Sequence, residues 1–509
     1  MQRSFLRRAA AASAAALVLS ASAGATWSIV VVNTATGEVI VAAATCIEGF
    51  DLDRHLPVMR VGQGGGVSQG LIDFGAPHRI KIWNGFLAGD TPAEIVNTLV
   101  TTGSSVPARQ WGIADFENAP ATYSGSSLGL EYHGVTGVVG DLRYAIQGNV
   151  ITADIVVTAA EAALLNTPGD MTQRVMAGME AARALGGDGR CSCLTGPPSS
   201  CGAPPPGFTK SAHVSFLIGS RMGDVDGTCS WATGCANGQY YIDLSVEGDW
   251  SDIDPIIQLE LDYDAWRLGM AGHPDHLKSS ATAGAQKLVA DGVTSTDVLV
   301  RLVDLEGQPI THGGATLTVE TESGAPPFAV PGAAVDHGDG TYTLTFTAGT
   351  SPGADAFRIR ANDGVEAATL YPFLELAVDP LTDLHVGVDG LSASGGGAAP
   401  FVLNLGPAAA GHPYILLASA AGTQPGVDLG GAILPLNPDW VLTHTLAHAG
   451  DSTFPGTLGV LDASGRAEAA LAAPPGALAP VVGMHLDWAA VDFAWPYSTT
   501  GAVGLDILP

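Results

Sequence analysis

The sequence predicts an α+β domain, with helices packed on antiparallel sheets, followed by two all-β sandwich domains. Helix-capping signals and all six cysteines stand in the first half of the 509 residues. The second half instead carries short strand patterns between turn pairs. The length allows about three or four domains, and 66 glycines with 32 prolines are typical of short strands joined by turns.

The first 25 residues predict an export signal. Three arginines precede a short apolar run, and Ala23-Gly24-Ala25 gives the small-x-small pattern after which signal peptidases cut. The run is too short for a membrane-spanning helix, and no later stretch of sequence is long and apolar enough to be one. We therefore expect a signal peptide over 1–25 and a secreted chain, located in the periplasm, at the cell surface or outside the cell.

The charge balance excludes nucleic acid as a partner. Fifty acidic and 21 basic residues give a net charge of −29, which opposes binding to nucleic-acid phosphates and to anionic lipid surfaces. The sequence predicts no metal and no cofactor. The expected partner is an unknown amide-containing substrate or a cell-surface ligand.

The first domain is expected over residues 26–277 and opens with a hairpin. Residues 27–32 and 38–44 are strand patterns around a Thr34–Gly37 turn. A capping box with a helix-initial proline stands at Thr91-Pro92-Ala93-Glu94, and Asp170 with Gln173 begins a second helix. Further strands are predicted at three places: 110–114, 144–147 and 212–217.

The two sandwich domains are expected over residues 278–378 and 379–509. Strand patterns in the first of them cover 298–303, 315–320, 341–346 and 357–361, at a spacing typical of a β-sandwich. The stretch from Gly272 to Gly284 lacks periodicity and is predicted to be an exposed linker.

Six cysteines in an exported chain indicate disulfides. Cys229 with Cys235 and Cys193 with Cys201 each flank a short loop, which leaves Cys46 to pair with Cys191. Six cysteines permit fifteen pairings, so this set is one choice among them. Cys46 has an alternative role as a reactive thiol near Thr26.

A series of short motifs runs through residues 26 to about 267. They are Thr26-Trp27-Ser28-Ile29-Val30, Val41 to Thr45, Arg60, Gly66-Val67-Ser68-Gln69, Tyr144 to Val150, Gly186 to Arg190, Lys210-Ser211-Ala212, Asp243 to Val246 and Asp254-Pro255-Ile256. Through these motifs the segment resembles an uncharacterised family, domain of unknown function 1028, which is assigned to the N-terminal-nucleophile (Ntn) hydrolases. The resemblance implies an αββα sandwich. This chain departs from the family in an insertion that holds three cysteines and in Lys210, where glutamine is usual.

The two later segments carry resemblances of their own. Residues 278–378 resemble the bacterial immunoglobulin-like domains of invasin- and intimin-type surface proteins, through 290–292, 304–309 and 339–343. That resemblance implies a spacer or adhesive module. Residues from about 383 onward look like a C-terminal β-sandwich of modular secreted bacterial proteins.

Thr26 is the candidate nucleophile. Cleavage after Ala25 gives it a free α-amine that can accept the hydroxyl proton, and such an amine titrates at about 7.7–8.0. The alternative is that cleavage simply leaves some residue first, and that residue is a threonine. If Asn33 pairs with Glu38, Thr45 faces Thr26. An ordinary strand-end hydroxyl is the alternative interpretation of Thr45, and the sequence alone favours it.

Other candidates complete the predicted site. Gln147 and Asn149 could stabilise an oxyanion or form a satisfied buried turn. Asp188 could bind the terminal amine or cap a loop. Arg60 and Gln69, in the family-like stretches, are candidate substrate-binding residues together with Thr45.

Three metal-like patterns are interpreted as structural. Asp224-Val225-Asp226-Gly227 lacks the ligand series of a calcium loop and is predicted to be a turn. His273-Pro274-Asp275-His276 is assigned to the linker. His444 and His448 have the spacing of a zinc-binding helix, but Thr443 and Thr445 favour a strand there.

Two hypotheses follow. In the first, the chain is an amidohydrolase that uses Thr26 and is positioned by its sandwich domains. In the second, it is a noncatalytic surface or binding protein on the same scaffold. The mature N-terminal residue is the cheapest observation that separates them.

Overall fold

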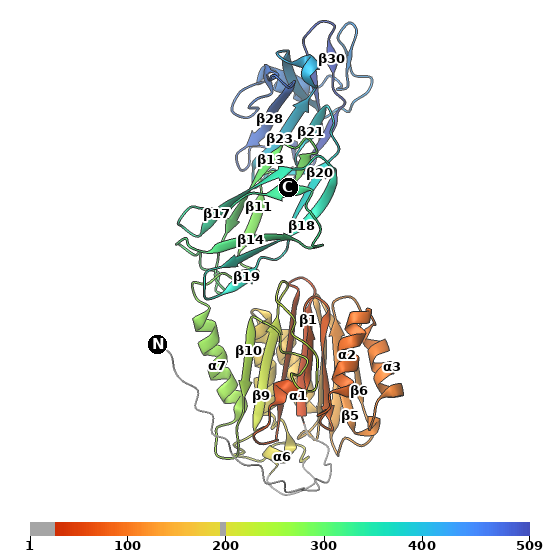
Figure 1. The fold of residues 1–509 in the computed structure, drawn as a ribbon, viewed down its shortest axis with the longest axis vertical. Coiled ribbons are helices and arrows are strands. Elements are labelled where there is room, and N and C mark those ends of the chain that lie inside the picture. The colour runs from red at the N-terminus through yellow and green to blue at the C-terminus, as the bar shows by residue number, and fades with distance from the viewer. Residues whose placement is uncertain (1–25, 194–199) are drawn as a thin grey trace. The chain divides into compact units, whose positions relative to one another are not determined.

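The computed structural model describes residues 26–193 and 200–509, so the predicted signal peptide, residues 1–25, lies outside the described residues. The chain divides into two compact units, residues 1–268 and 269–509. The first is an α+β domain, and the second is all-β apart from helix α8 and short 3-10 turns (Figure 1).

The first unit contains two antiparallel sheets. The larger sheet has, in spatial order, β10 (Ile242–Val246), β9 (Val214–Ser220), β2 (Glu38–Thr45), β1 (Thr26–Asn33), β8 (Leu142–Asn149) and β7 (Tyr132–Val139). The smaller sheet has β3 (Pro57–Arg60), β4 (Gly64–Gly70), β5 (Arg109–Asp115) and β6 (Ala121–Ser124). The helices are α1 (Leu52–His55), α2 (Pro77–Ala88), α3 (Pro92–Thr102), α4 (Ile155–Asn166), α5 (Met171–Ala184), α6 (Gly189–Ser192) and α7 (Pro255–Gly269).

Alternate side chains of β1 belong to different cores, because successive residues of a strand point to opposite faces. Ile29 and Val31 pack in a core with residues of α4, α5 and α7. Val30 and Val32 pack instead with Met59 and other side chains of the smaller sheet. The outer face of that sheet packs on α2 and α3 (Figure 1). The apolar run of β1 is therefore buried on both faces.

Local sequence patterns predicted several helices and strands correctly. The hairpin register is confirmed, since Asn33 pairs with Glu38 and Trp27 with Ala44. Thr91 and Asp170 each make the expected capping box, at the start of α3 and of α5. The strands predicted near 110–114, 144–147 and 212–217 are parts of β5, β8 and β9.

The six cysteines form three disulfides, and no cysteine of the described residues is free. The pairs are those chosen from the sequence: Cys46–Cys191, Cys193–Cys201 and Cys229–Cys235. The first bridge joins the end of β2 to α6 across 145 positions of sequence. It therefore ties two distant segments of the first unit together at one end of the larger sheet.

The second unit contains two successive sheet systems, and the strands predicted within 278–378 are confirmed as β13, β14, β17 and β18. The first system has β11 (Ser280–Ala283), β12 (Lys287–Val289), β13 (Ser295–Arg301), β14 (Thr316–Thr321), β15 (Ala329–Pro331), β16 (Val335–Asp336), β17 (Thr341–Ala348), β18 (Gly353–Asn362), β19 (Ala367–Thr369) and β20 (Leu374–Asp379). The second has β21 (Leu384–Val386), β22 (Gly390–Ser392), β23 (Gly397–Asn404), β24 (Pro413–Ser419), β25 (Val427–Asp428), β26 (Ile433–Leu434), α8 (Trp440–Ala447), β27 (Leu458–Val460), β28 (Arg466–Ala473), β29 (His485–Asp492), β30 (Ser498–Thr499) and β31 (Val503–Leu508).

Two sequence expectations in this unit are wrong. His444 and Thr445 lie in helix α8, not in a strand, because the Asp439 carboxylate caps the helix and the buried face of α8 packs beside β24. The predicted exposed linker is also incorrect over much of its length. Asp275 and His276 are buried, the Asp275 amide donates to Val303 O, and β11 forms within the predicted stretch.

Candidate functional site

Thr26 is the first residue of β1 and lies between the two neighbouring strands of the larger sheet. Its side chain is fully buried, and its Oγ1 donates a hydrogen bond to Thr45 Oγ1 at 3.3 Å. Asn149 is its cross-strand partner on β8. The structure thus brings together Thr26, Thr45 and Asn149, three residues that the sequence analysis selected from separate segments.

A buried polar network beneath Thr26 connects the two sheets. The Gln69 side-chain nitrogen lies 3.1 Å from Thr26 O, 2.7 Å from Gln110 Oε1 and 3.4 Å from Asn149 Oδ1. Its oxygen accepts a hydrogen bond from Ser28 Oγ at 2.6 Å. Gln69 is fully buried, and its amide is engaged by these protein partners, through which it holds the backbone of Thr26.

Gln147 belongs to the same network, where it contacts Ser28, two residues beyond Thr26 on β1. Its Nε2 donates to Ser28 Oγ at 2.6 Å, while its Oε1 has no partner among the described residues. A Cβ on Gly112 would stand 1.9 Å from that oxygen, so the amide fits only against a glycine. The predicted oxyanion role of Gln147 therefore competes with an existing bond to Ser28.

Asp188 and Arg190 reach the site from α6. Asp188 is fully buried, its Oδ2 accepts from Cys46 N at 2.7 Å, and it pairs with the Arg190 guanidinium at 2.8 Å. Arg190 also donates to Thr45 Oγ1 at 3.3 Å. The charge-assisted contacts fix the guanidinium beside the threonine pair, and the adjacent Cys46–Cys191 bridge holds α6 at this position.

His213 is a site residue that sequence reasoning missed. Its backbone N–H donates to Thr45 O, and its buried ring packs edge-on against Trp250 with centroids 4.5 Å apart. Its Nε2 lies 3.9 Å from Glu48 Oε1. Burial, assisted by the charge of Lys210, lowers the pKa of His213. Its place beside Thr45 follows from the pairing of β2 with β9, which no local sequence pattern predicts.

The sulfur atoms of Cys46 and Cys191 lie close to a His213 nitrogen, all within 4.8 Å of one another. A metal site at this point would need thiolate ligands. Because the two sulfurs are bonded to each other, they do not serve as such ligands in this structure.

Arg60 is not part of this constellation. Its guanidinium pairs with Asp226 at 2.8 Å and lies 4.6 Å from the centroid of the Trp83 ring. Gly62, two residues on, borders Met222, which also contacts the hairpin turn at Gly37. That turn lies at the other end of β1 from Thr26, roughly 20 Å away at the usual rise of a strand.

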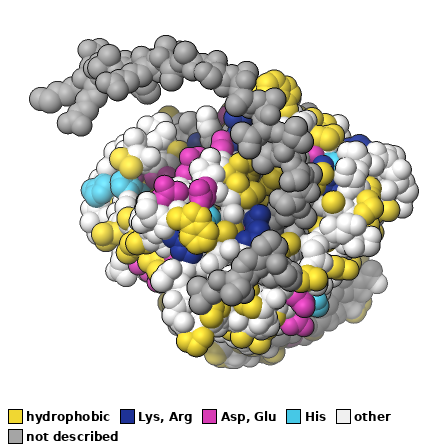
Figure 2. Space-filling view, turned by 90° about the horizontal axis from the view of Figure 1, so that it is seen from below, with side chains coloured by type: hydrophobic (Ala, Val, Ile, Leu, Met, Phe, Trp, Pro, Cys, Tyr) yellow, Lys and Arg dark blue, Asp and Glu magenta, His cyan; other side chains and the backbone are white. Residues whose placement is uncertain are grey.

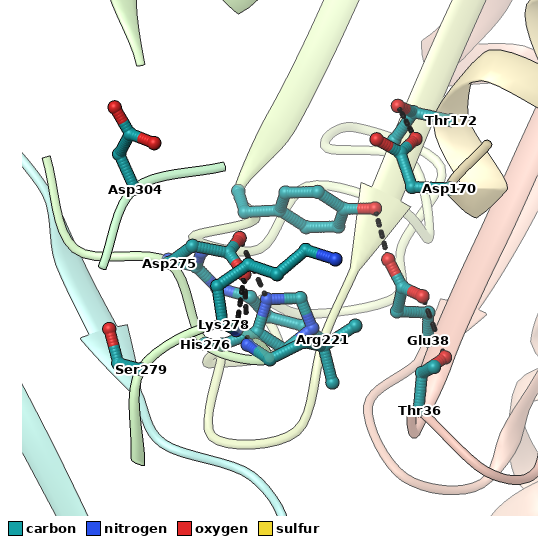
Figure 3. A network of polar contacts seen from close by, with 12 residues as sticks. Thr36, Glu38, Asp170, Thr172, Arg221, Asp275, His276, Lys278, Ser279 and Asp304 are labelled. Carbon is teal, nitrogen blue, oxygen red and sulfur yellow. Dashed lines mark hydrogen bonds and ion pairs between the residues drawn. The ribbon is translucent and has the colours of Figure 1, made fainter. Parts of the chain in front are cut away.

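The same distant end of the hairpin carries a separate polar cluster. Glu38 accepts from Thr36 at 2.6 Å and from Tyr241 at 2.9 Å (Figure 3). Asp224 accepts from the Arg221 backbone at 3.0 Å. The Asp224–Gly227 segment is therefore a loop whose carboxylates are occupied by protein partners, as the turn interpretation predicts.

The α6 end of the first unit faces the viewer in Figure 2. Acidic, basic and hydrophobic side chains are interspersed on the described part of this face. The geometry at this end is that of a strand-initial hydroxyl held by a second threonine and a guanidinium over a buried amide network. Such a hydroxyl can act as a nucleophile when a base takes its proton.

The fold and the three disulfides fit a multidomain extracellular protein, because disulfides persist in oxidising compartments. Residues 26–194 match the family of unknown function DUF1028, and residues 275–370 match invasin, domain 3. The chain thus carries one segment similar to DUF1028 proteins and, after it, one similar to an invasin domain. None of the helices in the described part of the chain has the length and apolar character needed to cross a membrane.

Several solved structures are similar to the chain. A DUF1028-family protein from Silicibacter pomeroyi is 17% identical, with 47% of this chain and 88% of that chain covered and a TM-score of 0.33. The Yersinia pseudotuberculosis adhesin InvE is 18% identical, with 45% and 59% covered and a TM-score of 0.16. Invasin, a bacterial integrin-binding protein, is 13% identical, with 79% and 56% covered and a TM-score of 0.17. The chain spans less than two thirds of the length of InvE and of invasin. Among curated proteins, none matches the sequence.

Proposed function

We propose that the first unit is an Ntn amidohydrolase with an αββα sandwich, and that Thr26 is its nucleophile after removal of residues 1–25 outside the cytoplasm. The observation that carries the proposal is the position of Thr26. The residue that follows the predicted cut site is also the first residue of a central strand, with its hydroxyl 3.3 Å from Thr45 Oγ1. Export and activation would then be a single event.

The proposed chemistry uses this chain's own groups. The α-amine of Thr26 takes the hydroxyl proton, and Oγ1 attacks the carbonyl carbon of an amide. The carbon–nitrogen bond breaks, the leaving amine takes the proton, and the acyl group stays on Thr26 as an ester. Water then hydrolyses the ester and restores the hydroxyl. Asn149, opposite Thr26 on β8, is the candidate for stabilising the oxyanion.

Asp188 and Arg190 act in this proposal as positioning residues. The carboxylate holds the guanidinium, and the guanidinium holds Thr45 beside Thr26. Asp188→Asn should therefore lower the rate of Thr26 acylation while Thr26 remains the labelled residue. Label on another residue in that variant would contradict the positioning role.

An electrophilic probe tests the nucleophile without knowledge of the substrate. The mature full-length chain, beginning at Thr26, should react with a β-lactone to give one covalent adduct, located on Thr26 by peptide mass spectrometry. Thr26→Ala should lose the adduct, and Thr26→Ser should keep it. A chain with one extra residue before Thr26 should label at least roughly a thousandfold more slowly, because its amide nitrogen is no base.

Thr36→Ala is the matched control, since Thr36 lies at the opposite end of the same hairpin. This variant should react with the β-lactone at the same rate as the unsubstituted chain. Equal labelling of the extended and mature chains would refute the mechanism. An N-terminal sequence of the exported protein that begins elsewhere than Thr26 would do the same.

A second function is supported by the match of residues 275–370 to an invasin domain. In this alternative the chain is a noncatalytic surface or extracellular binding protein on an Ntn scaffold. Binding of the full-length chain to intact cells, measured by flow cytometry, should then be saturable and unchanged by Thr26→Ala. Absence of saturable binding to a broad panel of cells would count against this alternative.

A further inference from the structure

The last part of the second unit contains a cavity of about 280 Å³ that the proposed hydrolase chemistry does not use. It lies between α8, strands β28 and β29, and the segment that follows β28. Buried apolar side chains form its interior, and the rim includes the exposed residues Trp440, His444, Ala477 and Pro480.

The cavity is a pocket with an open rim and not a closed void, since four of its lining residues are exposed. Ligand sites are commonly concave, mainly apolar pockets of this kind with a few polar groups. An apolar cavity of about 150 Å³ is large enough to take up benzene. The present one therefore has room for an aromatic ring with a short substituent.

One buried donor in the lining has no acceptor. Trp488 is 1% exposed, and its Nε1 has no hydrogen-bond partner among the described residues. Leaving a buried N–H unpaired destabilises the protein, because the group has lost its hydrogen bonds to water. The buried Thr445 hydroxyl, in contrast, accepts from Ala418 N and donates to Leu442 O.

The chemistry of the lining selects one class of ligand. None of the lining residues is Asp, Glu, Lys or Arg, so an ionic group inside would be desolvated without a counter-charge. A sugar would bury several hydroxyls against Val441, Leu471 and Leu478, which offer no partners. A ligand with an apolar body and one acceptor would fill the pocket and pair the indole N–H.

We propose that this cavity is a binding site for small, uncharged, mainly apolar molecules that carry one hydrogen-bond acceptor, such as an aromatic ketone. The apolar body occupies the space beside Phe454 and Leu478. The acceptor takes the Trp488 N–H, and Trp440 and His444 on α8 flank the entrance. This site is independent of Thr26, and it holds whether or not the first unit is an enzyme.

A matched pair of probes tests the site on the mature full-length chain. Acetophenone and ethylbenzene have similar shapes, but only the ketone can accept a hydrogen bond. Titrations followed by ligand-observed NMR should give one saturable site for acetophenone. Ethylbenzene should bind about three- to tenfold more weakly, which is the usual contribution of one hydrogen bond.

Substitutions distinguish the contribution of the Trp488 N–H from that of the apolar cavity. Trp488→Phe should abolish the difference between the two probes, whereas Trp495→Phe, at an exposed tryptophan outside the lining, should leave it unchanged. Ala477→Phe and His444→Phe, on the segment after β28 and on α8, should each weaken both probes at least tenfold. Because both positions are exposed, these two variants should fold normally.

Three results would overturn the proposal. One is the absence of saturable binding of either probe. Another is binding that neither entrance variant weakens, which would locate the probes elsewhere on the chain. The third is a preference for acetophenone that survives Trp488→Phe, which would remove the indole N–H as the recognition element.

Discussion

Removal of the Cys46–Cys191 bridge should destabilise the first unit far more than removal of a local bridge. The two cysteines are 145 positions apart. In the chain-entropy model, freeing a loop of that length costs about 5 kcal/mol at 25 °C. The Cys229–Cys235 bridge spans only 6 positions, for which the same model gives about 2 kcal/mol. The expected difference, about 3 kcal/mol, is large beside a total domain stability of roughly 5–15 kcal/mol.

Differential scanning calorimetry of the mature chain measures this difference. The two compact units should give separate transitions, which double serine variants assign. Cys46→Ser with Cys191→Ser should lower the first-unit transition by about 10–20 °C, and Cys229→Ser with Cys235→Ser by about 4–8 °C. The second-unit transition should not move in either variant, because all six cysteines precede residue 269.

The double variant also probes the candidate site. The bridge holds α6 where Asp188 meets the Cys46 backbone N–H and Arg190 meets Thr45. Labelling of Thr26 by the β-lactone should therefore slow in the Cys46/Cys191 variant and stay unchanged in the Cys229/Cys235 variant. Equal shifts of the first-unit transition in both variants would refute the loop-length reasoning.

Two further predictions concern packing and pH. Gly112→Ala places a Cβ 1.9 Å from Gln147 Oε1 and should lower the free energy of unfolding of the first unit by about 1–3 kcal/mol in urea titrations. Gly75→Ala, whose Cβ would meet only Pro77 Cδ at 3.6 Å, is the matched control in the same unit, and equal effects would contradict the steric argument. In the second unit, burial raises the pKa of Asp275, but the hydrogen bond from His276 and backbone N–H groups outweigh it and lower this pKa to about 2. Because the folded pKa is depressed, Asp275 should contribute about 2 kcal/mol above pH 4 that is lost as the pH falls from about 4 to 2. Urea midpoints of Asp275→Asn should lack this part of the acid dependence, and identical pH profiles would refute it.

Features set by neighbouring residues were accessible from the sequence. The four-residue turn and the alternation of the flanking strands set the register of β1 and β2, and that register alone predicted that Thr26 faces Thr45. The capping boxes at Thr91 and Asp170 are likewise local, since each joins residues three positions apart. Two of the disulfides close short loops, which left a single partner for Cys46.

Features set by distant segments were not accessible. Thr443 and Thr445 prefer strands by their β-branched side chains, yet Asp439 and packing beside β24 make α8 a helix. Arg60 stands in a family-like stretch, but its partner Asp226 comes from a loop far along the chain and keeps it away from Thr26. The cavity at Trp488 likewise exists only because several separate segments meet there.

The sequence by itself determined the facing threonine and the order of the α+β and all-β parts, because capping, turn length and side-chain alternation act over a few residues. The candidate nucleophile came from the predicted cut site together with the family resemblance. Only the tertiary structure decided what surrounds the nucleophile. Asp188, Arg190 and His213 reach Thr45 through a sheet pairing, a disulfide and buried charge contacts between segments about 140–170 positions apart. Such contacts depend on burial and on the pairing of strands, and neither is encoded in a local pattern.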